Sequence, residues 1–151
     1  MEHQGMVHAL EEIHRLLTPG GLFVDIHPVP ELPLIRVYDH GEVLLEEPLV
    51  DTVDEGIIRA ERALAEVVDR GLFIVGMSHE FDFQAYASSV GELWDYLELM
   101  NAFDNSPKDE AAALREQELA VRVENILRKS GEGAEVAYYE KGKITRMRPV
   151  K

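Results

Sequence analysis

The chain has 151 residues, no cysteine and a formal net charge of -14. Its length predicts that residues 1–151 form one domain with a single core, and the lack of cysteine excludes disulfides, thiolate metal sites and cysteine nucleophiles. The charge argues against nucleic acid and anionic membranes as partners. No apolar stretch approaches the ~18 residues of a membrane span and the N-terminus lacks a basic signal region, so we expect a cytoplasmic protein.

The stretch from Val7 to Ile26 predicts a helix, a turn and a strand. Apolar residues recur at spacings of three and four up to Leu17, which is typical of an amphipathic helix. A Thr-Pro-Gly-Gly turn follows, in which we expect Gly20 or Gly21 to take the left-handed conformation that ends a helix. The nearly unbroken apolar run after the turn is typical of a parallel strand that is covered on both faces.

Further along the chain, the hydrophobic pattern predicts a hairpin, three more helices, a long strand and a second hairpin. The first of these helices begins with a capping box at Thr52, the second is capped by Ser88 or Ser89, and the third is capped by Ser106 with Pro107 at its first position. The expected ranges are 34–45 for the hairpin, 52–70, 90–100 and 107–129 for the helices, 72–85 for the strand and 136–150 for the C-terminal hairpin, which turns at 140–143.

Four segments carry a resemblance to a known family: Met1-Glu2-His3, the helix from Ala9 to Leu17, the turn from Thr18 to Gly21, and the strand that begins Leu22 to Asp25. Together they resemble the middle of class I S-adenosylmethionine-dependent methyltransferases. In that family a Leu-Glu-His-like segment follows the fourth strand, and a helix ending in Leu-Lys-Pro-Gly-Gly leads into the fifth. Thr18 stands where the family most often has Lys.

The resemblance implies an α/β fold with a Rossmann-like, methyltransferase-type sheet of mixed parallel and antiparallel strands and flanking helices, of which this chain would be the C-terminal half. It implies S-adenosylmethionine as the cofactor and methyl transfer to a small molecule as the activity. The family's glycine-rich cofactor loop and the acidic residue ending its second strand would lie before Met1, so we expect upstream sequence to complete the enzyme and the isolated chain not to bind the cofactor. The alternative is a complete, non-catalytic, methyltransferase-derived binding or dimerisation module.

A homodimer is expected from the same half-fold. A sheet that lacks the strand beside Leu22 to Ile26 would leave an apolar edge open, and natural proteins seldom leave such an edge uncovered. The net charge opposes association, but exposed charges are screened beyond roughly 8 Å at physiological ionic strength. Pairing with a second copy about a two-fold axis would cover the edge.

Three residues are the candidates for a site. Asp25 and His27 lie at the carboxyl end of the first strand, where open α/β sheets bind ligands, and His27 near a carboxylate suits a general base. The pair is therefore the candidate substrate-binding site, and the alternative is that Asp25 bonds a neighbouring loop and His27 is a solvated strand end. His3 is similar to the His of the family's Leu-Glu-His segment, which implies a place at the cofactor, and the alternative is a disordered terminal residue.

No catalytic residue is assigned, because the chain has no phosphate-binding loop, nucleophile elbow or zinc signature. We also expect no metal site, since His79 alternates away from Glu80 and Asp82 on a strand and the three side chains do not converge. Three aromatic side chains either wall a substrate pocket or belong to the core: Trp94, Tyr96 and Phe103.

Overall fold

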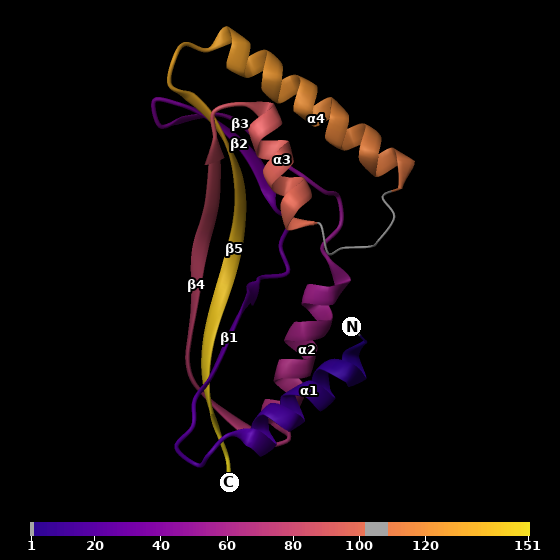
Figure 1. Ribbon diagram of the computed structural model, residues 1–151, viewed down its shortest axis with the longest axis vertical. Helices are drawn as coiled ribbons and strands as arrows, with labels where there is room; N and C mark the ends of the chain where they lie inside the picture. Colours follow the sequence, from indigo (N-terminus) through magenta and orange to yellow (C-terminus); the bar gives the residue numbers. More distant parts are fainter. Residues whose placement is uncertain (1, 102–108) are drawn as a thin grey trace. The chain divides into compact units, whose positions relative to one another are not determined.

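The computed structural model describes residues 2–101 and 109–151, and this part of the chain contains four helices and five strands (Figure 1). In chain order the elements are α1 (His3–Leu16), β1 (Phe23–Pro28), β2 (Leu34–Asp39), β3 (Glu42–Pro48), α2 (Glu55–Asp69), β4 (Phe73–Ala87), α3 (Val90–Met100), α4 (Glu110–Lys129) and β5 (Ala134–Pro149). The predictions of the first hairpin and of the α2 and α3 helices are confirmed at the level of the element.

All the paired strands are antiparallel, so the predicted Rossmann-like sheet of mixed parallel and antiparallel strands is wrong. β1 pairs with the C-terminal half of β5, from Phe23 opposite Met147 to Pro28 opposite Gly142. β2 pairs with β3 and with the N-terminal half of β5, and β4 also pairs with β5. The helix before β1 therefore belongs to no parallel β-α-β crossover.

The error comes from the apolar run in β1, which suggested a strand covered on both faces. In the structure the burial of β1 alternates: Val24 and Ile26 are exposed, whereas Phe23, Asp25 and His27 are partly buried. Alternation of this kind is typical of an antiparallel strand with one covered face. The exposed face carries the apolar Val24 and Ile26, which is why the run looked apolar on both sides.

The chain divides into two compact units, and each is described by itself. Unit 1 comprises Met1–Glu31, Thr52–Asp82 and Lys141–Lys151, and unit 2 comprises Leu32–Asp51 and Phe83–Glu140. The long strands β4 and β5 contribute residues to both units.

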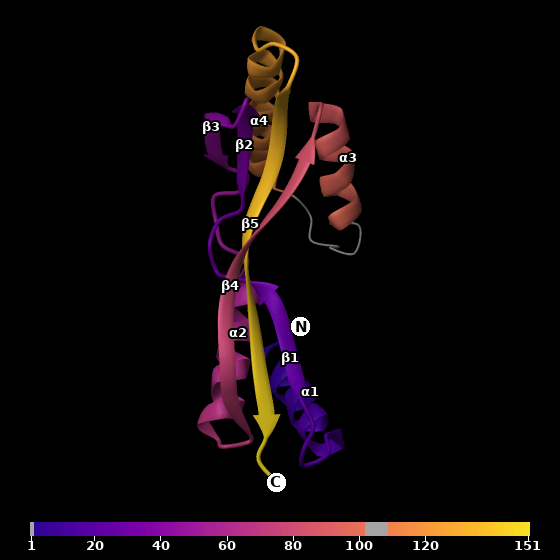
Figure 2. The ribbon, with the colours of Figure 1, turned by 90° about the vertical axis from the view of Figure 1, so that its left-hand side faces the viewer.

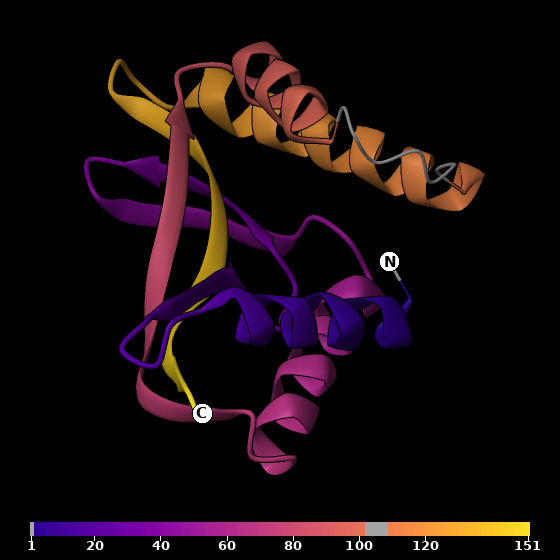
Figure 3. The same ribbon diagram turned by 60° about the horizontal axis from the view of Figure 1, so that its bottom comes forward.

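In unit 1, α1 and α2 cover one face of a three-stranded sheet in which β5 lies between β1 and β4 (Figure 2). The two helices cross each other on that face (Figure 3). Phe73 is central to the packing, with the rings of His14 and Phe23 centred 5.4 and 5.7 Å from its own. The buried core residues are Val7, Leu10, Ala63, Val67, Phe73 and Met147. Neither helix of unit 1 covers the opposite face, which we call the outer face of unit 1 (Figure 2).

In unit 2, α3 and α4 cover the side of β2 that carries Ile35 and Val37. The buried core residues are Ile35, Val37, Ala87, Leu93, Leu97, Leu119, Val123, Val136 and Tyr138. The β2–β3 hairpin turns at His40 and Gly41, which have φ angles of 49° and 83°. Glycine suits the second of these positions because it has no Cβ to resist a positive φ.

Several element ends differ from the predictions. Asp54, not Thr52, caps α2 by accepting a hydrogen bond from the Gly56 N–H at 2.6 Å, because the helix begins three residues later than expected. Ser89 caps α3 as predicted. The predicted cap Ser106 and the helix start at Pro107 lie outside the described residues, and Asp109 caps α4 as described.

The turn before β1 and the C-terminal hairpin also differ. Neither Gly20 nor Gly21 has a positive φ, so the predicted left-handed residue is wrong, and the turn is closed by the Gly21 N–H donating to the Thr18 carbonyl at 2.8 Å. β5 runs unbroken where a hairpin was predicted. Gly142, which suggested the turn, lies within the strand against the ring of Phe81, where a Cβ would have no room.

Candidate functional site

The predicted pair Asp25 and His27 lies on the covered face of unit 1, where β1 places the two residues opposite Thr145 and Lys143 of β5. His27 Nδ1 lies 2.5 Å from Asp25 Oδ2. His27 Nε2 lies 2.7 Å from Oε1 of Glu61 on α2. The structure therefore brings the predicted pair together and adds Glu61, for which the sequence pattern gave no signal.

Lys143 completes a cluster of four side chains. Its Nζ donates to both carboxylate oxygens of Glu61, at 2.8 and 3.1 Å. Burial alone would raise the pKa of Glu61, but the hydrogen bonds from Lys143 and His27 outweigh burial and lower this pKa. We call Asp25, His27, Glu61 and Lys143 the His27 network, and it joins β1, α2 and β5.

The His27 network leaves little room for acid-base chemistry. Both ring nitrogens of His27 lie within hydrogen-bonding distance of carboxylate oxygens, one of Asp25 and one of Glu61. A general base needs a nitrogen within hydrogen-bonding reach of the proton that it takes from a substrate. Only 11% of the His27 side chain is exposed, and both nitrogens are engaged. The geometry fits a clamp between three elements, and substrate binding by Asp25 and His27 stays a prediction.

A cavity of about 280 Å³ lies beside the His27 network in unit 1. Glu61 and Lys143 form its charged end, together with the hydroxyls of Ser78 and Thr145, which lie 3.1 Å apart. Its apolar walls come from Leu64, Ala65, Val68, Val75 and Met147. Apolar walls with a few polar groups are typical of small-molecule sites, but the charges at this end are already paired within the protein.

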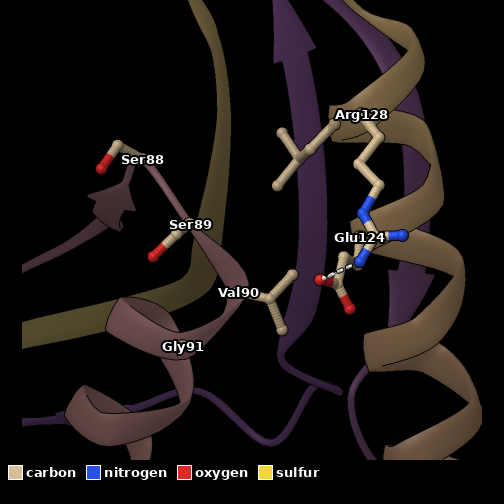
Figure 4. Close-up of a pocket in the computed structure, with 7 residues that line it drawn as sticks. Ser88, Ser89, Val90, Gly91, Glu124 and Arg128 are labelled. Carbon is tan, nitrogen blue, oxygen red and sulfur yellow. Dashed lines mark hydrogen bonds and ion pairs between the residues drawn. The ribbon is translucent and has the colours of Figure 1, made fainter.

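Unit 2 has a pocket of about 330 Å³ between the start of α3 and the C-terminal part of α4 (Figure 4). Ser89 Oγ accepts a hydrogen bond from the Glu92 N–H at 3.2 Å, and Ser88 Oγ donates to Glu92 Oε2 at 3.0 Å. Across the pocket, Arg128 donates to Glu124 at 2.9 Å. These polar groups serve helix capping and an ion pair, so they point to no particular ligand.

A second partly buried carboxyl group lies in unit 2. Glu140 forms a hydrogen bond with Tyr138, two residues earlier on β5. Burial raises the pKa of Glu140, and the hydrogen bond from Tyr138 offsets only part of this effect. Burial also raises the pKa of the Tyr138 hydroxyl, with further contributions from Glu140 and Tyr96. Both groups therefore favour their neutral forms.

His3, the cofactor residue implied by the resemblance, lies at the start of α1, and its Nε2 lies 2.8 Å from Oε2 of Glu66 on α2. A role at a cofactor stays a prediction, and Met1 of the same segment lies outside the described residues. Trp94 and Tyr96 pack against the core of unit 2, as the core alternative requires. Phe103 lies outside the described residues.

The described residues contain neither a metal-ligand cluster nor a helix able to cross a membrane. Among residues 2–101 and 109–151, no three His, Asp or Glu side chains are placed to hold a metal ion. His79, Glu80 and Asp82 are exposed on β4. Within the same part of the chain, no helix has the length and apolar character needed to cross a membrane.

The outer face of unit 1 is the surface that the sequence did not predict. Ser78 faces Thr145 on the covered side of the sheet, so its neighbour Met77 points to the outer face. The Phe81 ring lies against Gly142 on the same face. Ile74 points there too, because it directly follows the core residue Phe73. The alternation in β4 had suggested that the Met77 side is the buried one. The exposed fractions are 45% for Val24, 63% for Ile26, 63% for Ile74, 57% for Met77 and 37% for Phe81. With Ile144, which is opposite Ile26, these residues make up the apolar patch of the outer face.

Comparison with known proteins leaves the relationships of this chain open. No protein-family model, curated protein or solved structure matches it. The methyltransferase resemblance is therefore neither supported nor refuted by relatives.

Proposed function

We propose that this chain is a protein-binding module that associates with a second copy of itself through the sheet of unit 1. The observation that carries the proposal is the apolar patch of the outer face, which neither helix of unit 1 covers. Contiguous exposed apolar patches larger than a few hundred Å² are rare on monomeric soluble proteins and mark interaction sites. The sequence analysis gave a non-catalytic binding or dimerisation module as its alternative to a methyltransferase.

The free strand edges of unit 1 support the same conclusion. Within the described part of the chain, β1 and β4 each pair with β5 and with no other strand. Each therefore presents one row of backbone N–H and C=O groups that no neighbouring strand pairs. Open edges of this kind are templates for pairing with another chain.

The charges are placed so that they oppose association only weakly. Across the outer face, β1 contributes Val24 and Ile26, β5 contributes Ile144 and Arg146, and none of these positions is acidic. The carboxylates that give the chain its charge of -14 lie elsewhere. Covering a half-exposed Met or Phe contributes roughly 1 kcal/mol, so the patch residues that two copies bury between them offset part of an association cost of about 4 to 15 kcal/mol.

The partly buried charged groups argue for binding rather than for catalysis. In the His27 network Lys143 pairs with Glu61, and both ring nitrogens of His27 are engaged by carboxylate oxygens. The polar groups around the unit 2 pocket are engaged in the same way. In unit 1 it is therefore the apolar patch, and not a charged group, that has no partner within the unit.

Light scattering coupled to size exclusion tests the proposal. We expect the chain to have twice its monomer mass of 17.1 kDa at micromolar concentrations, and Met77→Lys to shift it to the monomer. Leu99→Lys is the matched control, because Leu99 is 71% exposed on α3 in unit 2. A monomer at all concentrations, or a dimer that persists in Met77→Lys with Ile26→Lys, would contradict the proposal.

Methyl transfer, the activity that the resemblance implies, stays a separate prediction. The parallel sheet that the resemblance also implied is wrong, as the antiparallel pairing shows. We still expect no binding of S-adenosylmethionine to the isolated chain, because the glycine-rich loop that would hold it has no counterpart here. Calorimetric titration measures this, and a one-to-one isotherm at micromolar affinity would contradict it.

A further inference from the structure

The edge of β4 in unit 1 is unusual in its length and exposure. All residues from Ile74 to Asp82 are exposed, although they lie in the middle of a strand. Among the described strands, only β5 pairs with β4. Proteins usually blunt such an edge with a short strand, a proline or charged side chains, above all lysine. This segment is long and has no proline or lysine, and its charged residues are Glu80 and Asp82.

We infer that two copies join by antiparallel pairing of β4 with β4 of the second copy. The two-fold axis lies between His79 and its own copy. The inference rests on the proposed self-association and specifies how it occurs. The two unit 1 sheets become one continuous sheet, with their outer faces on the same side. An antiparallel pair of identical strands is self-complementary, as a two-fold interface requires.

The side chains select this register over its neighbours. With His79 opposite its own copy, Met77 lies opposite Phe81 of the second copy, and Ser78 lies opposite Glu80 of the second copy. Both apolar side chains of the seam then meet an apolar side chain, twice by symmetry. Each Glu80 meets a hydroxyl, to which it offers hydrogen-bond acceptors.

The nearest alternatives are worse. Moving the axis to Glu80 places Glu80 directly opposite its own copy, and like charges in facing positions are destabilising. Moving the axis to Ser78 places Met77 opposite His79 and separates it from Phe81. Registers with the axis between two residues place outer-face residues opposite covered-face residues, which a continuous sheet does not permit.

Edge pairing also accounts for the arginine on the outer face. Arg146 extends over Gly76, where a Cβ would lie 3.7 Å from Arg146 Nε. Stacking two outer faces on each other would bury this guanidinium against a second apolar patch, and an unpaired buried charge is costly. Pairing along β4 leaves Arg146, on the neighbouring strand β5, in contact with water.

The absence of cysteine from the chain makes the register directly testable. Facing residues in an antiparallel pair have Cα atoms roughly 4.5 or 5.5 Å apart. Both separations fall within the ~4.4 to 6.8 Å range of disulfides. Under mild oxidation we expect His79→Cys to form a disulfide-linked dimer. Met77→Cys alone should not, because its copy lies four residues away along the strand, at roughly 13 Å.

A mixture supplies the matched control. Met77→Cys and Phe81→Cys chains, each unable to cross-link with itself, should cross-link when combined, since each faces the other across the seam. Strong cross-linking of Ile26→Cys with none at His79→Cys would overturn the β4 register while leaving self-association intact. A monomer by light scattering for all of these variants, with native circular dichroism, would instead overturn the proposed function and the inference together.

Discussion

Units 1 and 2 have the same plan, two helices on one face of antiparallel strands, and they differ in what the other face carries. In unit 2, polar side chains on that face pair with one another. Arg36 lies 3.8 Å from the centre of the Tyr139 ring and pairs with Glu46 at 2.7 Å, and Tyr38 donates to Gln84 at 2.8 Å. In unit 1 the corresponding face is apolar and open. The fold thus provides two equivalent surfaces, and the side chains determine which one is available to a partner.

The partly buried carboxyl groups of the two units also differ, with the better-paired group in unit 1. Glu61 of unit 1 has a lysine and a histidine as partners, and its pKa is lowered although burial acts in the other direction. Glu140 of unit 2 has the Tyr138 hydroxyl as its partner, and burial raises its pKa. In unit 1 the partly buried Glu61 has charged hydrogen-bond partners, and the outer face is apolar and open. In unit 2 the polar groups of the outer face are paired, and the partly buried Glu140 has only a neutral hydroxyl as its partner.

The largest effect is expected from removing the centre of one core. Phe73 in unit 1 and Leu93 in unit 2 are 2% and 1% exposed. Phe73→Ala should cost about 3 to 5 kcal/mol and Leu93→Ala about 2 to 5 kcal/mol in the free energy of unfolding. Because the two cores are separate clusters, each substitution should accelerate hydrogen exchange mainly in its own unit. Equal acceleration in both units would show that the chain unfolds as one cooperative body.

Local patterns in the sequence predicted elements well and pairings poorly. The period of 3.6 and the capping signals indicated α2 and α3, and the Asp-His-Gly turn indicated the first hairpin. These features depend on residues close together in the chain. Strand direction depends on distant partners: β1 pairs with β5, and Gly142, which resembles a turn signal, is a strand residue that makes room for Phe81.

The site shows the same limit. Asp25 and His27 are two residues apart on a strand, and alternation places them on one face, so their contact followed from the sequence. Glu61 was missed because it reaches His27 from α2, and Lys143 was missed because it reaches Glu61 from the C-terminal strand β5. The open patch was missed because an alternating strand shows that its faces differ, not which one the helices cover.

Two glycines are needed for different reasons: Gly21, in the turn before β1 of unit 1, for space, and Gly41, in the hairpin of unit 2, for its positive φ. A Cβ at Gly21 would lie 2.9 Å from the Thr18 carbonyl oxygen, which the Gly21 N–H already fixes, so Gly21→Val should cost roughly 1 to 3 kcal/mol. Gly41→Val, at a φ of 83° in open space, should cost a similar amount through backbone strain. Gly20→Val is the control, because nothing lies within 4 Å of its Cβ position. Thermal melts measure all three, and an unchanged midpoint for Gly21→Val would show that the turn adapts.

Lys143→Met removes the charged hydrogen-bond donor of Glu61. We expect a loss of about 1 to 2 kcal/mol at neutral pH, because a partly buried carboxylate loses a charged hydrogen-bond partner. A lowered pKa stabilises the fold above the ordinary range for Glu, and this stabilisation disappears as pH falls. The difference between the variant and the parent chain should therefore narrow below about pH 4. Lys129→Met on exposed α4 is the control, and a difference independent of pH would contradict a role for the charge.

The smallest effect, and the one of opposite sign, is expected at Glu140. Its raised pKa means that the fold favours the neutral acid, so the stability it contributes is present below the ordinary range for Glu and is lost as pH rises through the raised value. At pH 7 the partly buried carboxylate is a net cost, and Glu140→Gln removes the charge while its carbonyl still accepts a hydrogen bond from Tyr138. We expect the melting midpoint to rise by at most about 2 to 4 °C, the shift that ~1 kcal/mol gives at this chain length. Glu61→Gln in unit 1 should lower the midpoint under the same conditions, because it weakens the contacts to Lys143 and His27. Changes of the same sign in the two variants at neutral pH would show that the surroundings of the two carboxyl groups do not differ as the structure indicates.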